Sequence, residues 1–243
     1  MIAGHAIVHL IYPLETWRQG GIGGLSRDEQ ARAARFHFEK DARHWIACRL
    51  ALRSILAEAL TIPPLEVPLV TGEFGKPELA APFQHLHFNL SHCPDLAIVA
   101  LCGDGPVGVD LESLARAADL PGCEESFCHP AEIRALPVAA DARATELLRI
   151  WTAKEAVLKA IGTGMSVPPE TVRVSPDGVG WRAVADGSLP DLEHQRIHRL
   201  VAPGLAAHLA MLSAPESVHR IDVFHDPKSV AHVHKHPETP PTL

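Results

Sequence analysis

The 243-residue sequence is poor in aromatic residues, has no excess of positive charge and contains no long apolar run. Phe, Trp and Tyr make up 5% of the chain, so it lacks the stacking side chains with which proteins hold nucleic-acid bases. Lys and Arg number 22 against 29 Asp and Glu, and the net charge of −7 gives no overall field that attracts nucleic acid or an anionic membrane. We therefore expect neither a nucleic-acid partner nor a membrane partner.

Apolar segments and cysteines exclude further classes of protein. The apolar start, Ile2 to Leu14, is interrupted by His5, His9 and Pro13, and no Lys or Arg precedes it, so it favours a strand over a leader or a membrane helix. Five cysteines without a C-x-x-C pair favour neither a disulfide framework nor a zinc ribbon. A reduced, cytoplasmic protein is expected.

The remaining composition, 47% apolar and 21% charged, is typical of one large globular domain or two small packed lobes. Ser26 and Glu29 have capping-box spacing within a helical region over residues 25–60, which we expect to break near 36–41. A second long helix is predicted over 144–161. Strands are predicted at residues 67–70, 85–89, 96–102, 107–112, 172–174, 181–184 and 206–213.

Each long helix precedes an apolar strand by a similar distance. Trp45 lies about 53 residues before Ile98, and Trp151 lies about 58 residues before Leu209. Two similar α/β lobes would explain this spacing, although any α/β chain repeats helix and strand. We interpret both tryptophans as core residues.

Residues 107–112 place two carboxylates on one face of a strand. With a period of two, Asp110 and Glu112 point to one side, and the three apolar side chains point to the other. Neighbouring carboxylates on an apolar strand are costly unless a cation joins them, and an all-oxygen set favours Mg²⁺ or Ca²⁺. A solvated strand end is the alternative.

The second long helix carries a polar face beside its apolar stripe. Thr152, Glu155 and Lys159 share this face, with Glu155 and Lys159 one turn apart. Lys154 lies in the middle of the apolar stripe, where a lysine must reach solvent or meet an anion. An ordinary exposed Glu–Lys pair is the alternative explanation of the polar face.

Three further segments stand out, of which the first and the last could hold phosphate. Residues 87–92, His-Phe-Asn-Leu-Ser-His, end in a hydroxyl and an imidazole, unless they form an ordinary polar turn. Residues 72–77 form a glycine-containing turn that presents Lys76, or a plain loop. From Arg27 to Arg53, seven basic and four acidic residues give a local charge of +3 against −10 elsewhere, which indicates an anion-binding surface or only a solvated face.

In this order, the segments resemble the 4'-phosphopantetheinyl transferase superfamily, in particular its two-lobed surfactin-synthetase-activating (Sfp) type with a W-x-x-K-E-A motif. The matching segments are Arg35-Phe36 with Asp41, Gly75-Lys-Pro77, Phe88-Asn-Leu-Ser-His92, Gly108-Val-Asp-Leu-Glu112, Phe127 to Leu136 with Glu132, and Trp151-Thr-Ala-Lys-Glu-Ala156 with Lys159. The resemblance covers roughly residues 25–175. It implies a monomeric α+β (α/β) fold of two pseudo-twofold-related lobes, each a small, mostly antiparallel sheet packed by a long helix.

The expected division of the chain follows from this resemblance. We expect an N-terminal lobe over residues 1–104, a C-terminal lobe with the metal site over 105–225, and a Pro- and His-rich tail over 226–243. The tail histidines invite a metal-binding interpretation, but no carboxylate or cysteine spacing completes a site, so a mobile tail is expected.

The resemblance also implies a reaction. The chain would transfer the 4'-phosphopantetheine group of coenzyme A to a serine of an apo acyl, aryl or peptidyl carrier protein and release adenosine 3',5'-bisphosphate. Asp110, Glu155 and Lys159 would be catalytic, and Asp110, Glu112 and Glu155 would hold Mg²⁺. The implied contacts to coenzyme A are Arg32, Arg35, Gly75, Lys76, Asn89, Ser91, His92, Lys154 and Lys159. The alternatives are an inactive module that binds coenzyme A or a carrier protein, and an unrelated Mg²⁺-dependent phosphohydrolase.

Overall fold

The computed structural model describes residues 6–18, 21–177, 180–185, 196–200, 204–211 and 220–224. The helices are α1 (Glu15–Arg18), α2 (Arg27–Ala33), α3 (Glu39–Leu60), α4 (Pro130–Ala135) and α5 (Ala140–Ile161). The strands are β1 (Ala6–Ile11), β2 (Leu69–Thr71), β3 (Pro77–Leu79), β4 (His87–Cys93), β5 (Leu96–Cys102), β6 (Val107–Ser113), β7 (Val172–Asp177), β8 (Gly180–Ala185), β9 (Arg196–Leu200), β10 (Leu205–Met211) and β11 (Arg220–Phe224). The expected tail over 226–243 lies outside the described residues.

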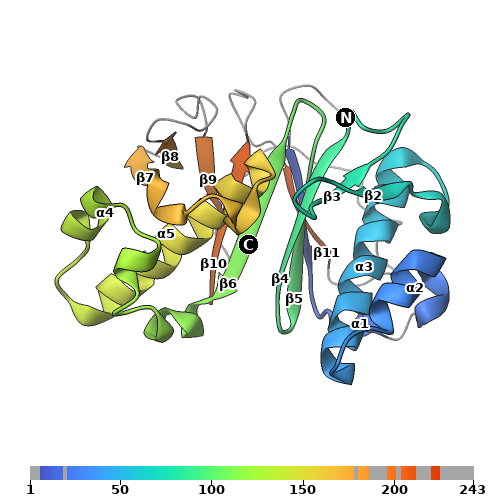
Figure 1. The fold of residues 1–243 in the computed structure, drawn as a ribbon, viewed down its shortest axis with the longest axis horizontal. Coiled ribbons are helices and arrows are strands. Elements are labelled where there is room, and N and C mark those ends of the chain that lie inside the picture. Colours follow the sequence, from blue (N-terminus) through green and yellow to red (C-terminus); the bar gives the residue numbers. More distant parts are fainter. Residues whose placement is uncertain are drawn as a thin grey trace.

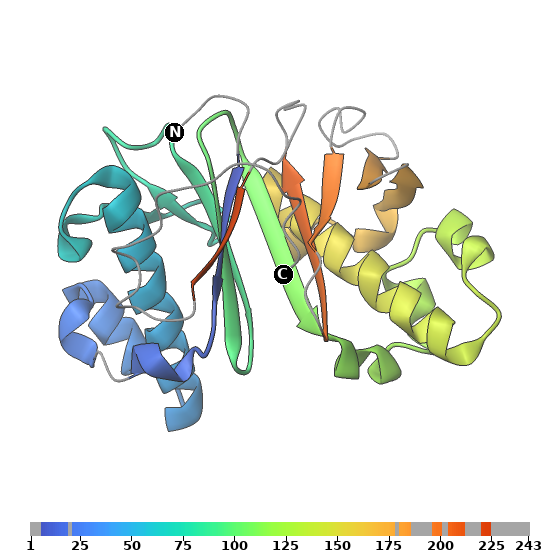
Figure 2. The ribbon, with the colours of Figure 1, turned by 180° about the vertical axis from the view of Figure 1, so that it is seen from behind.

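The fold is a four-layer stack of helix, sheet, sheet and helix (Figure 1). The first sheet has the strand order β11-β1-β5-β4 and carries α3 on its outer face, whereas the second has the order β6-β10-β9-β8-β7 and carries α5 (Figure 2). One apolar core lies under each long helix, and a third contains side chains of both sheets. The predicted α+β architecture of mostly antiparallel sheets with long helices is therefore confirmed.

The two faces of β6 are those that the period of two predicts. Val107, Val109 and Leu111 are buried in the core between the sheets. Asp110 and Glu112 therefore project toward α5. Because β6 is an edge strand of the second sheet and β4 is an edge strand of the first, these carboxylates lie at the junction between the two sheets.

The N-terminal helices begin and end close to the predicted positions. α2 opens with the predicted capping box, in which the Glu29 amide donates to the Ser26 hydroxyl at 3.3 Å and the Ser26 amide donates to the Glu29 carboxylate at 2.8 Å. The same carboxylate accepts a 2.7 Å bond from Arg53, whose residue is only 3% exposed. Arg53 is thus a buried structural cation and adds nothing to the basic surface that we expected over residues 27–53.

Trp45 is not the core residue that the sequence predicted. It is half-buried, and the guanidinium groups of Arg32 and Arg49 lie 5.4 Å and 5.1 Å from its ring. Trp151 is also half-buried and packs edge-on against Phe127, with 5.4 Å between the ring centroids. Cation–π contacts at a surface thus replace burial at Trp45.

The last described strand departs from the expected lobe boundary. β11 pairs in parallel with β1, from Ile7 opposite Arg220 to Ile11 opposite Phe224. Residues 220–224 therefore belong to the first sheet, although we expected the C-terminal lobe to extend to residue 225. The chain returns to its starting sheet after completing the second one.

Two features concern membrane-spanning helices and disulfide bonds. Among the described residues, no helix combines the length and apolar character needed to span a bilayer. The five cysteines are all free thiols, as expected from their spacing.

α5 crosses β6 so closely at Gly108 that no side chain fits there. A Cβ atom at this position would lie 2.0 Å from the carbonyl oxygen of Ala156 and 2.3 Å from the amide nitrogen of Ala160. Both are backbone atoms of α5, so a rotamer change cannot relieve the clash. The crossing sets the height of Glu155 and Lys159 above β6.

We expect Gly108→Ala to lower the free energy of unfolding by about 3 kcal/mol, because α5 must lift away from β6 to accommodate the methyl group. Urea unfolding checks this. Gly23→Ala is the matched control, since no atom lies within 4 Å of its added Cβ. Equal stability of the Gly108 and Gly23 variants would show that the crossing is not tight.

Candidate active site

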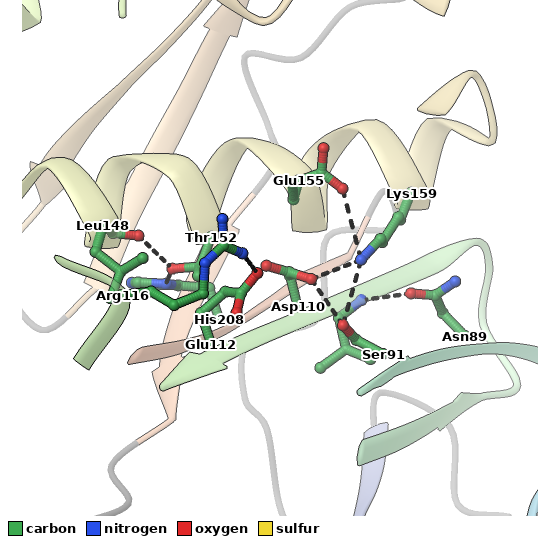
Figure 3. A network of polar contacts seen from close by, with 11 residues as sticks. Asn89, Ser91, Asp110, Glu112, Arg116, Leu148, Thr152, Glu155, Lys159 and His208 are labelled. Atoms are coloured by element: carbon green, nitrogen blue, oxygen red, sulfur yellow. Dashed lines mark hydrogen bonds and ion pairs between the residues drawn. The ribbon is translucent and has the colours of Figure 1, made fainter. Parts of the chain in front are cut away.

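The acidic face of β6 and the polar face of α5 meet at Lys159 (Figure 3). The Lys159 ammonium lies 2.6 Å from the Asp110 carboxylate and 3.5 Å from the Glu155 carboxylate. Ser91 of β4 donates a 2.7 Å hydrogen bond to the same Asp110 oxygen, and Lys159 lies 3.3 Å from the Ser91 hydroxyl. Three elements thus contribute to one polar cluster: β4 of the first sheet, β6 of the second sheet, and α5, which packs on the second sheet.

Two predicted ligand-binding residues satisfy the free edge of β6. The strand pairs with β10 on one side only, which leaves backbone groups of its other edge without a strand partner. The Asn89 side chain accepts a 2.9 Å bond from the Val109 amide, and the Lys76 ammonium donates a 3.1 Å bond to the Val107 carbonyl. Asn89 and Lys76 therefore hold β6 against the first lobe.

Lys76 also holds the end of α5. Its ammonium donates a 2.6 Å bond to the Lys159 carbonyl, and the turn that presents it depends on Gly75, whose φ is +83°. Burial lowers the pKa of Lys76 to about 8. The residue lines a cavity of about 210 Å³ between the β2–β3 turn and the end of α5, together with Pro77, His87, Phe88, Pro106 and Gly162.

Burial also changes the acid–base properties of the carboxylates. Desolvation raises the pKa of Glu155, with a further rise from Asp110, while Lys159 opposes both. Desolvation likewise raises the pKa of Glu112, which forms an ion pair with Arg116. The site contains three carboxylates, those of Asp110, Glu112 and Glu155, against the two cations that pair with them, Lys159 and Arg116.

The residues fit a hard divalent cation by their chemistry. One oxygen of Asp110, Oδ2, is buried without a hydrogen-bond partner, and such an atom is costly unless a ligand binds it. Glu112 and Glu155 supply further carboxylate oxygens of the type that Mg²⁺ prefers. The three carboxylates do not converge within 4.8 Å of one another, since His44, Cys48 and His92 are the only such trio among the described residues.

Lys154 does not join this cluster, and its predicted contact with coenzyme A is not supported. The residue is fully buried, at 0% exposure, and its ammonium forms a 2.7 Å ion pair with Glu132. It also donates to the backbone carbonyls of Phe127 at 2.7 Å and Pro169 at 3.1 Å. The anion that pairs with this lysine is thus the internal carboxylate of Glu132. The three acceptors together satisfy all three protons of the Lys154 ammonium.

Ser91 and His92 were expected to act together, but the strand separates them. Ser91 faces Asp110, whereas the His92 ring points toward α3, where its Nδ1 lies 2.9 Å from the Nε2 of His44. Desolvation of its ring, although the residue as a whole is exposed, and the nearby His44 and Lys159 lower the pKa of His92 to about 4. The two neighbours therefore serve opposite faces of β4.

The predicted arginines lie apart from the carboxylates. Arg32 covers the Trp45 ring on α3, and Arg35 is exposed just after α2. Neither arginine contacts Asp110 or Glu155. Both therefore remain candidates only for contact with a part of a ligand that lies away from these carboxylates.

His208 is a buried polar residue of the site that sequence reasoning missed. It stands opposite Asp110 in the pairing of β10 with β6, and its Nδ1 lies 2.7 Å from the Thr152 hydroxyl. Burial lowers the pKa of His208 to about 3. A single histidine within the apolar run of residues 206–213 was the available signal.

We expect His208 to make the protein sensitive to mild acid. Its pKa is about 6.5 in an unfolded chain but lower in the folded one, so below pH 6.5 the unfolded state binds a proton that the folded state does not. Stability is therefore lost as the pH falls from 6.5 toward 3, by up to about 1.4 kcal/mol per pH unit. Urea unfolding across this range should show a shallower loss for His208→Gln, with His37→Gln as the control. An identical pH dependence in wild type and His208→Gln would contradict the assignment.

We expect Glu132→Gln to lower the free energy of unfolding by about 3 kcal/mol, because it leaves the Lys154 ammonium buried without its counter-charge. Asp177→Asn breaks an exposed pair with Arg182 and should cost less than about 1 kcal/mol. Thermal unfolding compares the two variants. Equal small losses would show that the pair of Lys154 with Glu132 contributes no more to stability than an exposed ion pair does.

Two family models match the chain. Residues 16–103 match the model of the 4'-phosphopantetheinyl transferase N-terminal region, and residues 106–210 match that of the 4'-phosphopantetheinyl transferase superfamily. Their boundary falls between β5 and β6, where the two sheets meet.

Curated relatives show the same likeness. The chain is 40% identical over 145 residues to the 4'-phosphopantetheinyl transferase HetI of a Nostoc species, which covers 58% of this chain and 61% of the relative. It is 34% identical over 148 residues to a putative 4'-phosphopantetheinyl transferase of a Synechocystis species, covering 58% of each chain. The matched region thus spans about six-tenths of these two relatives. The transferase psf-1 of Bacillus pumilus is 28% identical over 208 residues, 82% of this chain and 88% of the relative. With the two models covering most of residues 16–210, the chain belongs to the 4'-phosphopantetheinyl transferase superfamily.

Proposed function

We propose that this protein is an Sfp-type 4'-phosphopantetheinyl transferase that moves the phosphopantetheine group of coenzyme A to a serine of an apo carrier protein. The observation that carries the proposal is the cluster of Asp110, Glu155, Lys159 and Ser91 at the junction of the sheets, in a chain of this superfamily. We further propose that it acts as a cytoplasmic monomer, where its free thiols stay reduced.

The reaction exchanges one phosphorus–oxygen bond for another. The serine oxygen of the carrier protein bonds to the phosphorus that bears the pantetheine arm, and the bond from that phosphorus to the adenylate oxygen breaks. Adenosine 3',5'-bisphosphate leaves, and the serine proton must pass to a base. Positioning and charge compensation supply most of the catalysis in such a transfer.

Glu155 is the proposed acceptor of the serine proton. Its buried carboxylate has a raised pKa, so it binds a proton more readily than an exposed glutamate does. The adjacent Lys159 ammonium, 3.5 Å away, keeps the carboxylate ionised before the transfer.

Lys159 is proposed to stabilise negative charge on the phosphate oxygens. Asp110 and Ser91 hold its ammonium from the side of β6, at 2.6 Å and 3.3 Å. A cation already held in place needs little rearrangement when charge develops on the reacting group. Asp110 is thus proposed both to orient Lys159 and to offer its second oxygen to a metal ion.

Asp110, Glu112 and Glu155 are the proposed holders of Mg²⁺. The unpartnered Oδ2 of Asp110 supports this assignment, and so does the closeness of both glutamates to Asp110, whose charge contributes to raising the pKa of each. Mg²⁺ bound there would neutralise charge on the pyrophosphate. Glu112 must exchange its ion pair with Arg116 for this role, and Arg116 is half exposed and able to move.

Coenzyme A is proposed to enter at the edge where β4 meets β6. Lys76, with Gly75 forming its turn, lines the cavity of about 210 Å³ beside the end of α5. His92 is proposed to contact the nucleotide from the other face of β4, with Arg32 and Arg35 toward its outer phosphate. Asn89 contributes indirectly, by holding β6 at that edge.

The test is a transfer reaction with the purified full-length protein, coenzyme A, Mg²⁺ and a panel of apo carrier proteins. Mass spectrometry should show a gain of about 340 Da on a carrier protein, the mass of one phosphopantetheine group. Chelation of the metal should abolish the gain. No gain on any acyl, aryl or peptidyl carrier by folded protein would refute the proposal, and release of phosphate from simple esters would indicate a phosphohydrolase instead.

Variants connect the reaction to the cluster. Asp110→Asn and Glu155→Gln should each lower the rate at least about 100-fold while the protein stays folded, because each removes a charge from the reacting centre. Glu146→Gln is the matched control on α5, since Glu146 pairs with Arg149 away from the cluster. Wild-type rates in the Asp110 and Glu155 variants would place the chemistry elsewhere.

A further inference from the structure

A second cluster of metal-ligating side chains lies on the opposite face of β4 from Asp110. It consists of His44 and Cys48 of α3 and His92 of β4, whose ligand atoms all lie within 4.8 Å of one another. The two rings approach to 2.9 Å between Nε2 of His44 and Nδ1 of His92, and the Cys48 sulfur lies 3.7 Å from the same His44 nitrogen. This cluster contains no carboxylate.

We propose that His44, Cys48 and His92 form a binding site for Zn²⁺, separate from the carboxylates of the proposed reaction centre. Two imidazole nitrogens and one thiolate are the ligand types that Zn²⁺ takes in proteins, and Mg²⁺ does not. Three protein ligands leave one coordination position for water or a small ligand, and His92, which is exposed, opens the site to solvent.

The observed spacing is close to that of a loaded site. Tetrahedral Zn²⁺ with nitrogen at about 2.0 Å and sulfur at about 2.3 Å places its ligand atoms roughly 3.3 to 3.6 Å apart. The nitrogen–nitrogen distance of 2.9 Å must open by a few tenths of an ångström, whereas the nitrogen–sulfur distance of 3.7 Å needs almost no change. Rotation of the His44 and His92 side chains, neither of which is buried, can supply this change.

The backbone keeps these ligands together. His44 and Cys48 are four residues apart on α3 and so share one face of the helix. β4 presents Phe88, Leu90 and His92 on its α3-facing side, and the two apolar residues pack in the core beneath α3. The packing that holds α3 on the first sheet therefore also fixes the distance from His92 to the helical ligands.

The test uses Co²⁺, which substitutes for Zn²⁺ and reports its ligands by absorption. The full-length chain is studied with Cys123→Ser and with alanine at His225, His232, His234 and His236, because an exposed thiol and these histidines could bind Co²⁺ independently. We expect one Co²⁺ per chain with tetrahedral visible bands and a near-ultraviolet thiolate charge-transfer band. Absence of the charge-transfer band in this folded protein would overturn the proposal.

Single substitutions assign the ligands. Cys48→Ser should abolish the thiolate band, and His44→Ala and His92→Ala should each weaken Co²⁺ binding about 10-fold or more. Cys128→Ser, which removes another buried thiol in the other lobe, is the matched control and should keep the band. Circular dichroism checks that each variant is folded, and the exposed His92 provides a variant that removes no buried side chain. Survival of the band in Cys48→Ser would refute the site.

Discussion

The whole site depends on the close crossing of α5 over β6 at Gly108. Two backbone atoms of the helix occupy the space that a Cβ would need, so the helix lies directly on the strand. At that distance, the 2.6 Å contact of Lys159 with Asp110 follows from the two periodicities, 3.6 for the helix and two for the strand. A larger residue at position 108 would move Glu155 and Lys159 of α5 away from Asp110 and Glu112 of β6. The site would be disrupted although none of these four side chains had changed.

The lysine and arginine side chains of the protein carry the same charge, but they differ in burial and in the groups that they contact. Arg53 and Lys154 are fully enclosed and each neutralises one internal glutamate, Glu29 or Glu132. Lys76 uses two of its protons on backbone carbonyls, and burial lowers its pKa to about 8, so it is a structural cation beside a cavity. Lys159 contacts two carboxylates and remains partly exposed, which suits a cation that meets an incoming phosphate.

Local sequence patterns correctly predicted the structural features that depend only on residues close together in the chain. They gave the capping box at Ser26, the strand over residues 96–102 with its observed bounds, and the shared face of Glu155 and Lys159. They failed where the partner lies far along the chain. The ion pair of Lys154 with Glu132 and the return of β11 to the first sheet depend on tertiary packing, which no window of adjacent residues contains.

β4 separates two chemistries because successive residues of a strand face opposite sides. Ser91 joins a cluster of carboxylates and an ammonium, whereas His92 joins an imidazole and a thiol. Hard, oxygen-preferring cations and Zn²⁺ therefore have distinct binding partners only a few ångströms apart along one backbone. The Asn89 side chain ties β6 to the edge of β4, so Mg²⁺ and Zn²⁺ would be held on separate sides of the strand. A metal ion on His92 would then compete with the nucleotide end of the proposed substrate while leaving the carboxylates on the other face in place.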